Sequence, residues 1–279
     1  MPECVEVEII RRKLCRALMG KTLRAVAIYD SLLSSPNHGK SWQGSLTAIE
    51  RRGKALRFVI DGRKVFTVRL GMSGSLQLQA GSGQREKPEF NSPVFRFPFP
   101  ASRAPRLAFE IDGIRCVLID PRRFGRISWE GDEPRGWDIL NAISGSGAPA
   151  AFGLVFESSR ARIKSLLMDQ NKIAGLGNIY ANEILYAAGI HPSRMACRLT
   201  SGEVKSLWRS ARQVLSAALR AGGSSMRDYY HPDGAKGSFQ EEFKIYGRRK
   251  GALCLRCRTA IKVLMISQRS TFYCPKCQK

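Results

Sequence analysis

The sequence has none of the features that mark a membrane-spanning or exported protein. No apolar run approaches the roughly 20 residues needed to cross a bilayer, and no basic stretch reads as an amphipathic helix on a membrane surface. The amino terminus, "MPECVEVE", carries acids where a secretory signal carries bases. We therefore expect no export and no membrane partner.

Acidic residues are scarce as well. The chain has 23 Asp and Glu against 46 Lys and Arg, so its formal net charge is +23. A well-solvated basic surface could account for this charge. However, basic residues recur along the whole chain and often adjoin aromatic ones, as in Arg57-Phe58 and Arg123-Phe124. That pattern favours a nucleic acid as the partner.

Internal repeats and low-complexity tracts are absent, and the remaining patterns are of two kinds. Apolar residues recur at helical spacing from residue 5 to about residue 19, and again after residue 158. Between residues 22 and 129, short β-branched and aromatic runs alternate with turn residues. Two "IDG" tripeptides and one "EGD" tripeptide in this region are typical of hairpin turns. The middle region is therefore expected to form an antiparallel β-sandwich or barrel.

The fold class predicted from these patterns is α+β with several domains. Residues 81–105 hold five prolines and show little periodicity, which indicates a long surface loop. The expected division is a β-sandwich with a flanking helix at 1–130, a linker rich in Gly, Pro, Ser and Ala at 131–158, a helical region at 159–223, a polar glycine-rich loop at 224–250 and a small module at 251–279.

The eight cysteines fall into two groups. Cys4, Cys15, Cys116 and Cys197 are isolated among apolar neighbours and read as ordinary buried thiols. In the last module, two C-x-x-C pairs lie sixteen residues apart, a spacing that predicts one structural zinc ion rather than a redox pair. The four ligands would be Cys254, Cys257, Cys274 and Cys277. The intervening residues read as strand, turn and strand, with the hairpin tip near Gln268-Arg269-Ser270.

A glycine turn, Gly175-Leu176-Gly177, joins two helical stretches, and Asn178 is expected to be the N-cap of the second. Exposed glycine amides at a helix amino terminus can bind a phosphate, helped by Lys164 and Lys172. The alternative is an ordinary helical hairpin in which the glycines only turn the chain. The surrounding positive charge favours the phosphate site.

Several separated stretches follow one another along the chain: "MPECVEVE", "RRGKALRF", "RLGMSGSLQL", "DPRRFGRI", "LMDQNKIAGLGNIYANEILYAAGIHP" and "SQRSTFYCPKCQK". In this set and order the sequence resembles the bacterial formamidopyrimidine-DNA glycosylases, which are related to the endonuclease VIII-like enzymes. The resemblance spans essentially the whole chain. It implies a catalytic β-sandwich, a helix-two-turn-helix domain, a lesion-binding loop and a zinc finger. It also implies a monomer that acts on duplex DNA in the bacterial cytoplasm.

The activity implied by the resemblance is removal of oxidised purines, such as 8-oxoguanine and formamidopyrimidines, followed by β- and δ-elimination of the DNA backbone. Pro2 is the implied nucleophile once Met1 is removed, because a secondary amine that attacks C1′ of the sugar can form only a charged iminium. An α-amine titrates at about pH 7.7–8.0, so a useful fraction is neutral in the cell. Glu3 is the implied general acid and base, although acids in a first helical turn are also favoured by the helix dipole.

The resemblance assigns two more catalytic roles. In these roles Lys54 protonates or contacts the backbone of the damaged nucleotide, and Arg269 binds phosphate around the lesion and assists δ-elimination. Met72, Arg122 and Phe124 fill the gap left by an extruded base, which costs a few kcal/mol to flip out. Further DNA contacts are implied for Arg103, Arg160, Lys164 and Asn178.

The sequence departs from the family pattern in a few places. Cys4-Val5 replaces the usual Leu-Pro, Arg69 stands where a histidine is common, and the "KHDH" stretch expected before "RLAFEIDG" is absent. These departures bear on lesion preference, so two alternatives stay open. An endonuclease VIII-like preference for oxidised pyrimidines is disfavoured by the loop "GGSSMRDYYHPDGAKGSF". A catalytically silent DNA-binding protein is disfavoured by the intact Pro2-Glu3 pair.

Overall fold

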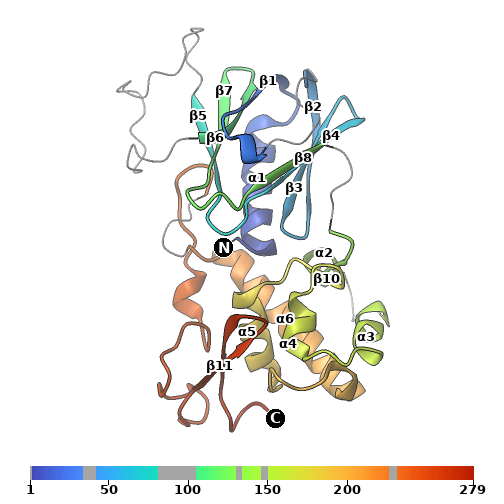
Figure 1. The fold of residues 1–279 in the computed structure, drawn as a ribbon, viewed down its shortest axis with the longest axis vertical. Helices are drawn as coiled ribbons and strands as arrows, with labels where there is room; N and C mark the ends of the chain where they lie inside the picture. Colours follow the sequence, from blue (N-terminus) through green and yellow to red (C-terminus); the bar gives the residue numbers. More distant parts are fainter. Residues whose placement is uncertain (1, 34–41, 81–104, 130–133, 146–149, 226–230) are drawn as a thin grey trace. The chain divides into compact units, whose positions relative to one another are not determined.

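The computed structural model describes residues 2–33, 42–80, 105–129, 134–145, 150–225 and 231–279. The chain divides into two compact units (Figure 1). The first comprises residues 1–2, 6–133 and 225–237, and the second comprises residues 3–5, 134–224 and 238–279. None of the helices in the described ranges combines the length and the apolar character that crossing a membrane requires.

The first unit is built on eight antiparallel strands in the order β5-β7-β6-β1-β2-β3-β4-β8. Two four-stranded halves are joined through β1 and β2 by the pairs Thr22–Ser45 and Leu23–Gly44. This arrangement confirms the expected antiparallel architecture. The strands are β1 (Thr22–Ile28), β2 (Gly44–Arg52), β3 (Ala55–Ile60), β4 (Lys64–Arg69), β5 (Ser75–Ala80), β6 (Pro105–Ile111), β7 (Ile114–Ile119) and β8 (Arg126–Trp129).

Two of the expected hairpin turns are present, and both contain an Asp-Gly pair at positive φ. Asp61 and Gly62 have φ of 51° and 69° between β3 and β4, and Asp112 and Gly113 have φ of 38° and 75° between β6 and β7. Positive φ at both central residues is what a type I′ turn requires, and Asp-Gly supplies it at low cost. The third expected turn, at residues 130–132, lies outside the described residues, and the next strand pairs elsewhere.

The core of the first unit lies between the two halves of the sheet and helix α1 (Cys4–Leu18). Val7, Ile10, Leu14 and Leu18 recur at intervals of three and four, so they share one helix face, and all four are buried in this core. The helix predicted over residues 5–19 is thus confirmed. The ring of Phe109 on β6 lies 5.0 Å from that of Phe66 on β4, which ties the two halves together.

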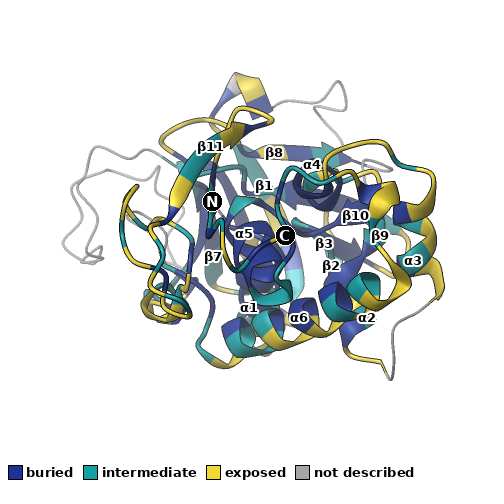
Figure 2. Ribbon diagram, turned by 90° about the horizontal axis from the view of Figure 1, so that it is seen from below, coloured by how far each residue is buried: buried dark blue, intermediate teal, exposed yellow. Residues whose placement is uncertain are grey.

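The second unit combines helices with two short sheets. Helix α5 is buried from Ile179 to Tyr186 (Figure 2) and packs against α6. The elements are β9 (Trp137–Asp138), α2 (Ile139–Ile143), α3 (Ala150–Glu157), α4 (Ile163–Met168), β10 (Ile173–Ala174), α5 (Asn178–Ala188), α6 (Ser201–Arg220), β11 (Lys262–Ile266) and β12 (Arg269–Tyr273).

Much of the segment expected to be a linker, residues 131–158, is folded into the second unit. It supplies β9, α2 and α3. The physical reason is aromatic burial, because Phe152 lies 5.7 Å from the ring of Trp137 and 5.0 Å from that of Trp208. Small residues in this segment suggested a loop, but its few large apolar residues determine its structure.

Residues 224–250, expected as one loop, are divided between the units. Residues 225–237 group with the first unit and residues 238–250 with the second. In the first unit, Lys13 of α1 donates hydrogen bonds of 2.7 and 2.6 Å to the carboxylate of Asp233. The backbone N–H of Leu78 on β5 also donates to the carbonyl of Pro232. Residues 226–230, and residues 81–104 of the segment expected to form a surface loop at 81–105, lie outside the described residues.

Candidate active site

The amino terminus of α5 is occupied by the carboxylate of Glu3. Its oxygens accept hydrogen bonds from the backbone N–H groups of Gly177 at 2.5 Å, Ile179 at 2.8 Å and Tyr180 at 3.4 Å. The first N–H groups of a helix have no partner within the helix, and the helix dipole places partial positive charge there. Glu3 is completely buried. The carboxylate is therefore fixed in position by the second unit, and it stabilises that helix end.

This geometry corrects two predictions about the glycine turn. The N-cap of α5 is Gly177, and Asn178 is the first helical residue. The N–H of Gly175 donates to Oε1 of Gln170 at 3.0 Å, and that of Gly177 donates to Glu3. Both glycine amides are thus used within the chain, so the predicted phosphate site at these amides is wrong. Glu3 lies so far away in sequence that the local pattern could not reveal it.

Lys164 differs from its prediction as well. It is fully buried on α4, and its Nζ donates to Oγ1 of Thr271 at 2.6 Å and to the carbonyl of Ser270 at 3.2 Å. Burial is the main cause that lowers the pKa of Lys164 to about 8; the charge of Glu3 opposes this shift and that of Arg269 adds to it. The ammonium is thus held against the zinc-finger hairpin and has no exposed surface for a phosphate contact.

Asn178 and Arg269 lie at the same end of this hairpin. Nδ2 of Asn178 donates to the carbonyl of Ser270 at 3.2 Å. Arg269 is exposed and begins β12, and the turn before it consists of Ser267 and Gln268 at φ of 49° and 55°. The hairpin was predicted, but its tip lies one to two residues earlier than expected.

Tyr246 joins this group, although no pattern in the sequence indicated it. Burial raises the pKa of Tyr246, and so does the charge of Glu3, whereas a hydrogen bond with Asn178 and the charge of Arg269 lower it. The phenol therefore lies within electrostatic reach of both charged groups. The second unit brings together Glu3, Lys164, Asn178, Tyr246 and Arg269.

Glu183 was also missed by sequence reasoning. It is buried on α5, and its carboxylate accepts hydrogen bonds from the backbone N–H groups of Lys244, Ile245 and Tyr246. It thereby fixes the chain segment that carries Tyr246. The sequence signal that could have identified it is an acidic residue in the middle of a largely apolar helix, because such a carboxylate needs hydrogen-bond partners when it is buried.

The remaining predicted catalytic residues lie in the first unit. Pro2 is buried and directly precedes Glu3 in the chain. Lys54 is half-buried in the turn between β2 and β3. Because Pro2 and Lys54 belong to one unit and Glu3 and Arg269 to the other, the assembly of the four stays a prediction.

The residues predicted to fill the gap left by an extruded base lie on two loops of the first unit. Met72 is half-buried on the loop between β4 and β5. Arg122 and Phe124 are exposed on the loop between β7 and β8, and the guanidinium of Arg122 lies 5.0 Å from the centre of the Phe124 ring. An exposed aromatic ring stacked with a cation is suited to contact nucleobases.

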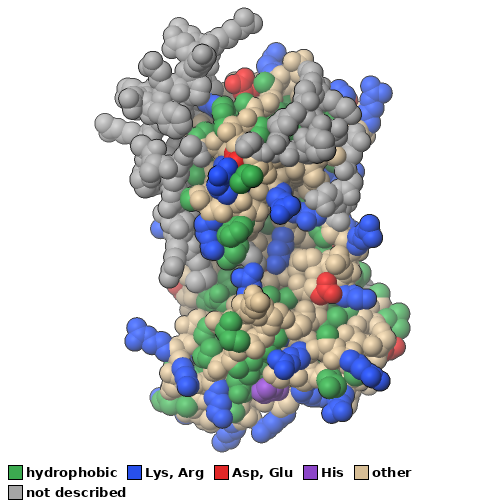
Figure 3. All heavy atoms as spheres, in the orientation of Figure 1, with side chains coloured by type: hydrophobic (Ala, Val, Ile, Leu, Met, Phe, Trp, Pro, Cys, Tyr) green, Lys and Arg blue, Asp and Glu red, His purple; other side chains and the backbone are tan. Residues whose placement is uncertain are grey.

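Among the other predicted DNA contacts, Arg160 is exposed just before α4, and Arg103 lies outside the described residues. Lys and Arg side chains are numerous on the face of each unit shown in Figure 3, and acidic side chains are few. This distribution fits the net charge and a polyanionic partner.

The four cysteines of the last module form a compact cluster. Their Sγ atoms all lie within 4.8 Å of one another, with 3.8 Å between those of Cys254 and Cys277 and 3.4 Å between those of Cys257 and Cys274. Sulfurs about 2.3 Å from one tetrahedral zinc ion lie about 3.8 Å apart. The backbone N–H of Cys277 also points to Sγ of Cys274. The cluster fits one structural zinc ion, as predicted.

Models of known families match three consecutive parts of the chain. The formamidopyrimidine-DNA glycosylase N-terminal domain matches residues 1–127, the H2TH domain of the same glycosylase matches residues 142–230, and a zinc finger found in FPG and IleRS matches residues 251–279. The formamidopyrimidine-DNA glycosylase of Methylobacillus flagellatus is 36% identical over 288 residues, covering 100% of this chain and 97% of its own length. The chain belongs to the formamidopyrimidine-DNA glycosylase family. The enzyme of Gluconobacter oxydans is 37% identical, with both chains covered in full.

Solved structures of this glycosylase family share the fold. The MutM (Fpg) protein of Thermus thermophilus superposes with a TM-score of 0.81 at 34% identity, over 99% of this chain and 98% of that one. The Lactococcus lactis Fpg bound to DNA with an abasic site has a TM-score of 0.79 at 26% identity, over 99% of each chain. The resemblance seen in the motifs is therefore confirmed over the whole chain.

Proposed function

We propose that this chain is a DNA glycosylase and AP lyase that excises oxidised purines, 8-oxoguanine and formamidopyrimidines, from duplex DNA. The observation that carries the proposal is the Pro2-Glu3 pair, in which the nucleophile adjoins a buried carboxylate held on the amino terminus of α5. Family membership supports the reaction class, and a mutant of the Lactococcus lactis Fpg has been solved with DNA containing Fapy-dG.

The proposed chemistry begins at the mature amino terminus. The Pro2 nitrogen attacks C1′, the bond from C1′ to the base nitrogen breaks with the electron pair leaving on the base, and the sugar ring opens to an iminium. Glu3 transfers the protons of ring opening and of the elimination that follows. The iminium withdraws electrons from C2′, so loss of a C2′ proton expels the 3′ phosphate.

The other predicted residues have supporting roles in this proposal. Lys54 contacts the damaged nucleotide, and Arg269 neutralises phosphate charge during the second elimination. Asn178 and Arg160 are proposed backbone contacts, and Met72, Arg122 and Phe124 fill the gap in the duplex. The zinc ion would be held by the four cysteines and would keep β11 and β12 rigid, so that Arg269 stays in place.

The proposed domain division keeps a catalytic β-sandwich, a helix-two-turn-helix domain, a lesion-binding loop and a zinc finger, with residues 134–224 and 238–279 assigned to the second unit and residues 225–237 to the first. All the relatives described above are bacterial, and we place the activity in the bacterial cytoplasm, with the protein acting as a monomer.

Borohydride trapping tests the reaction. Borohydride reduces the iminium to a stable amine, so an enzyme of this kind becomes covalently attached to its substrate. We expect trapping on duplexes with 8-oxoguanine, and at least a tenfold loss of trapping in Pro2→Gly. Binding without trapping or strand cleavage would overturn the enzyme proposal and leave a non-catalytic DNA-binding protein.

A parallel duplex with thymine glycol tests lesion preference. The Lactococcus lactis Fpg has also been solved with DNA containing an oxidised pyrimidine, so some trapping on thymine glycol is compatible with the proposal. Trapping chiefly on thymine glycol would replace oxidised purines by oxidised pyrimidines as the proposed substrates.

A further inference from the structure

Two loops of the first unit meet at the residues proposed to enter the duplex. The β4–β5 loop (residues 70–74) carries Met72, and the β7–β8 loop (residues 120–125) carries Arg122 and Phe124. Gly71 has φ of 64°, and a Cβ added there would lie 2.5 Å from the carbonyl carbon of Phe124. The two backbones are therefore in direct contact, and only glycine fits this position.

Ser73 and Asp120 link the same two loops through their side chains. Oγ of Ser73 donates to Oδ1 of Asp120 at 2.5 Å and accepts from the backbone N–H of Arg122 at 3.3 Å. Oδ2 of Asp120 accepts from the N–H of Gly125 at 2.6 Å. The hydroxyl of Ser73 thus joins the two loops, and the carboxylate of Asp120 ties together the two ends of the β7–β8 loop.

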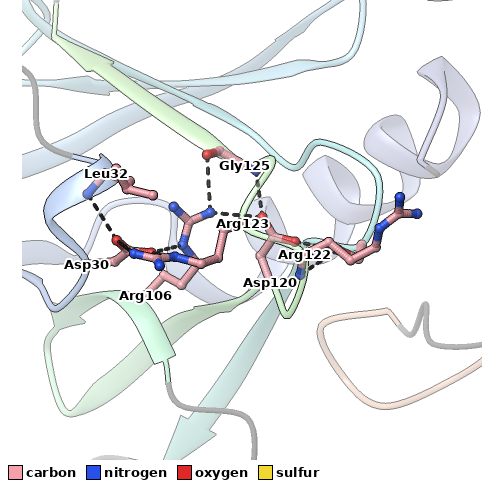
Figure 4. A network of polar contacts seen from close by, with 8 residues as sticks. Asp30, Leu32, Arg106, Asp120, Arg122, Arg123 and Gly125 are labelled. Atoms are coloured by element: carbon pink, nitrogen blue, oxygen red, sulfur yellow. Dashed lines mark hydrogen bonds and ion pairs between the residues drawn. The ribbon is translucent and has the colours of Figure 1, made fainter.

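A buried arginine on β6 extends this network to Asp30, which follows β1 (Figure 4). Nη1 of Arg106 on β6 donates to Oδ2 of Asp120 at 2.9 Å, and its Nε donates to Oδ2 of Asp30 at 2.5 Å. Asp30 also accepts from Nε of Arg123 at 2.9 Å. The side chains of Asp120, Arg106 and Asp30 are 0%, 5% and 9% exposed.

The composition of this network suggests a role beyond ordinary packing. Two buried carboxylates are balanced by the buried guanidinium of Arg106 and the half-exposed guanidinium of Arg123, and buried charges are tolerated only when they are paired and hydrogen-bonded. Arg123 has φ of 56°, a region that residues other than glycine rarely adopt. Its ion pair with Asp30 holds it there, between the exposed Arg122 and Phe124. The network thus fixes the backbone that presents both side chains.

We propose that Ser73, Asp120, Arg106 and Asp30 are positioning residues that lock the two loops into one rigid wedge. The wedge presents Met72, Arg122 and Phe124 to the duplex in a fixed relative geometry, so that they enter together when the damaged base leaves. This inference rests on the proposed glycosylase function. If the three side chains are already held in position, less conformational entropy is lost when they enter the duplex as the base is extruded.

Ser73→Ala is the sharpest test, because it removes the link between the loops and leaves the buried ion pairs in place. We expect single-turnover excision of 8-oxoguanine from a duplex to fall at least tenfold. Trapping on a single-stranded oligonucleotide with a preformed abasic site needs no wedge and should stay within twofold of wild type. Ser73→Thr keeps the hydroxyl and should restore excision, and Ser128→Ala on β8 is the matched control.

Arg106→Met provides a second perturbation from the far end of the network, and it should show the same selective loss of duplex excision. A double variant adds a readout that a purely structural role would not move. If Ser73 acts through the wedge, the loss in excision rate for Ser73→Ala combined with Phe124→Ala should be smaller than the product of the two single fold-losses.

The outcomes separate this inference from the proposed function. Equal losses on the duplex and on the single-stranded abasic site would show a general folding defect and overturn the positioning role. Unchanged duplex excision in Ser73→Ala, or additive losses in the double variant, would overturn it too. Failure of the wild-type protein to be trapped on either substrate would instead refute the proposed function.

Discussion

Glu3→Gln tests whether the buried carboxylate caps α5. Two of its hydrogen bonds, at 2.5 and 2.8 Å, come from the N–H groups of Gly177 and Ile179. Glutamine keeps one acceptor oxygen, but it turns an NH₂ group toward another donor and removes the favourable interaction with the helix dipole. A hydrogen bond to a charged group contributes about 1.5–3 kcal/mol, and a charge at a helix end up to about 2 kcal/mol. We expect the free energy of local opening at the amino terminus of α5 to fall by about 2–4 kcal/mol in Glu3→Gln.

Hydrogen exchange of the backbone amides at residues 177–180 measures this loss locally. With about 1.4 kcal/mol for each factor of ten, these amides should exchange about 30- to 1,000-fold faster in Glu3→Gln. Glu157→Gln changes an exposed acid of the same unit and should leave them unaffected. Exchange as slow as in the wild type would refute the capping role, whatever happens to catalysis.

Three further predictions concern the second unit. Removing zinc should weaken duplex binding, measured by fluorescence anisotropy, because β11 and β12 lose their anchor, and full binding by verified zinc-free protein would contradict this. Lys164 has a pKa lowered to about 8 from 10.5, so the unfolded chain binds more protons between these values and stability should rise with pH there. Urea titrations should show this rise in the wild type and a smaller one in Lys164→Met, and equal slopes would argue against the burial of its ammonium. Glu183→Ala leaves three backbone N–H groups without their acceptor and should lower the free energy of unfolding by at least about 2–3 kcal/mol, whereas a change below about 0.5 kcal/mol would show that water replaces the carboxylate.

The parts of the fold that the sequence predicted are those whose signals are local. An Asp-Gly pair needs positive φ at both residues, so the turns at Asp61-Gly62 and Asp112-Gly113 could be placed before the structure was known. The spacing of the cysteines likewise predicts the metal cluster, because two C-x-x-C turns suffice for four ligands. Helix α1 could also be predicted, because the spacing of its apolar residues is visible within the helix sequence itself.

The parts that were missed depend on partners far apart in sequence. Asn178 has the chemistry of an N-cap, but Glu3 occupies that helix end from 174 residues away. Lys164 looks like a phosphate contact until Thr271 is seen to accept from it. Asp30 and Arg106 form an ion pair across 76 residues, and nothing in either segment indicates the other. Burial of a charge is decided by the fold, and local patterns do not report it.

The identity of the covalently attached residue tests the central claim most directly. The protein is trapped with borohydride on a duplex containing 8-oxoguanine, digested with trypsin, and the peptide that carries the sugar remnant is sequenced by mass spectrometry. The account predicts that the adduct lies on the amino nitrogen of Pro2, in a peptide that begins at residue 2 and has lost Met1. An adduct on Lys54 or on another lysine, with an unmodified amino terminus, would contradict it.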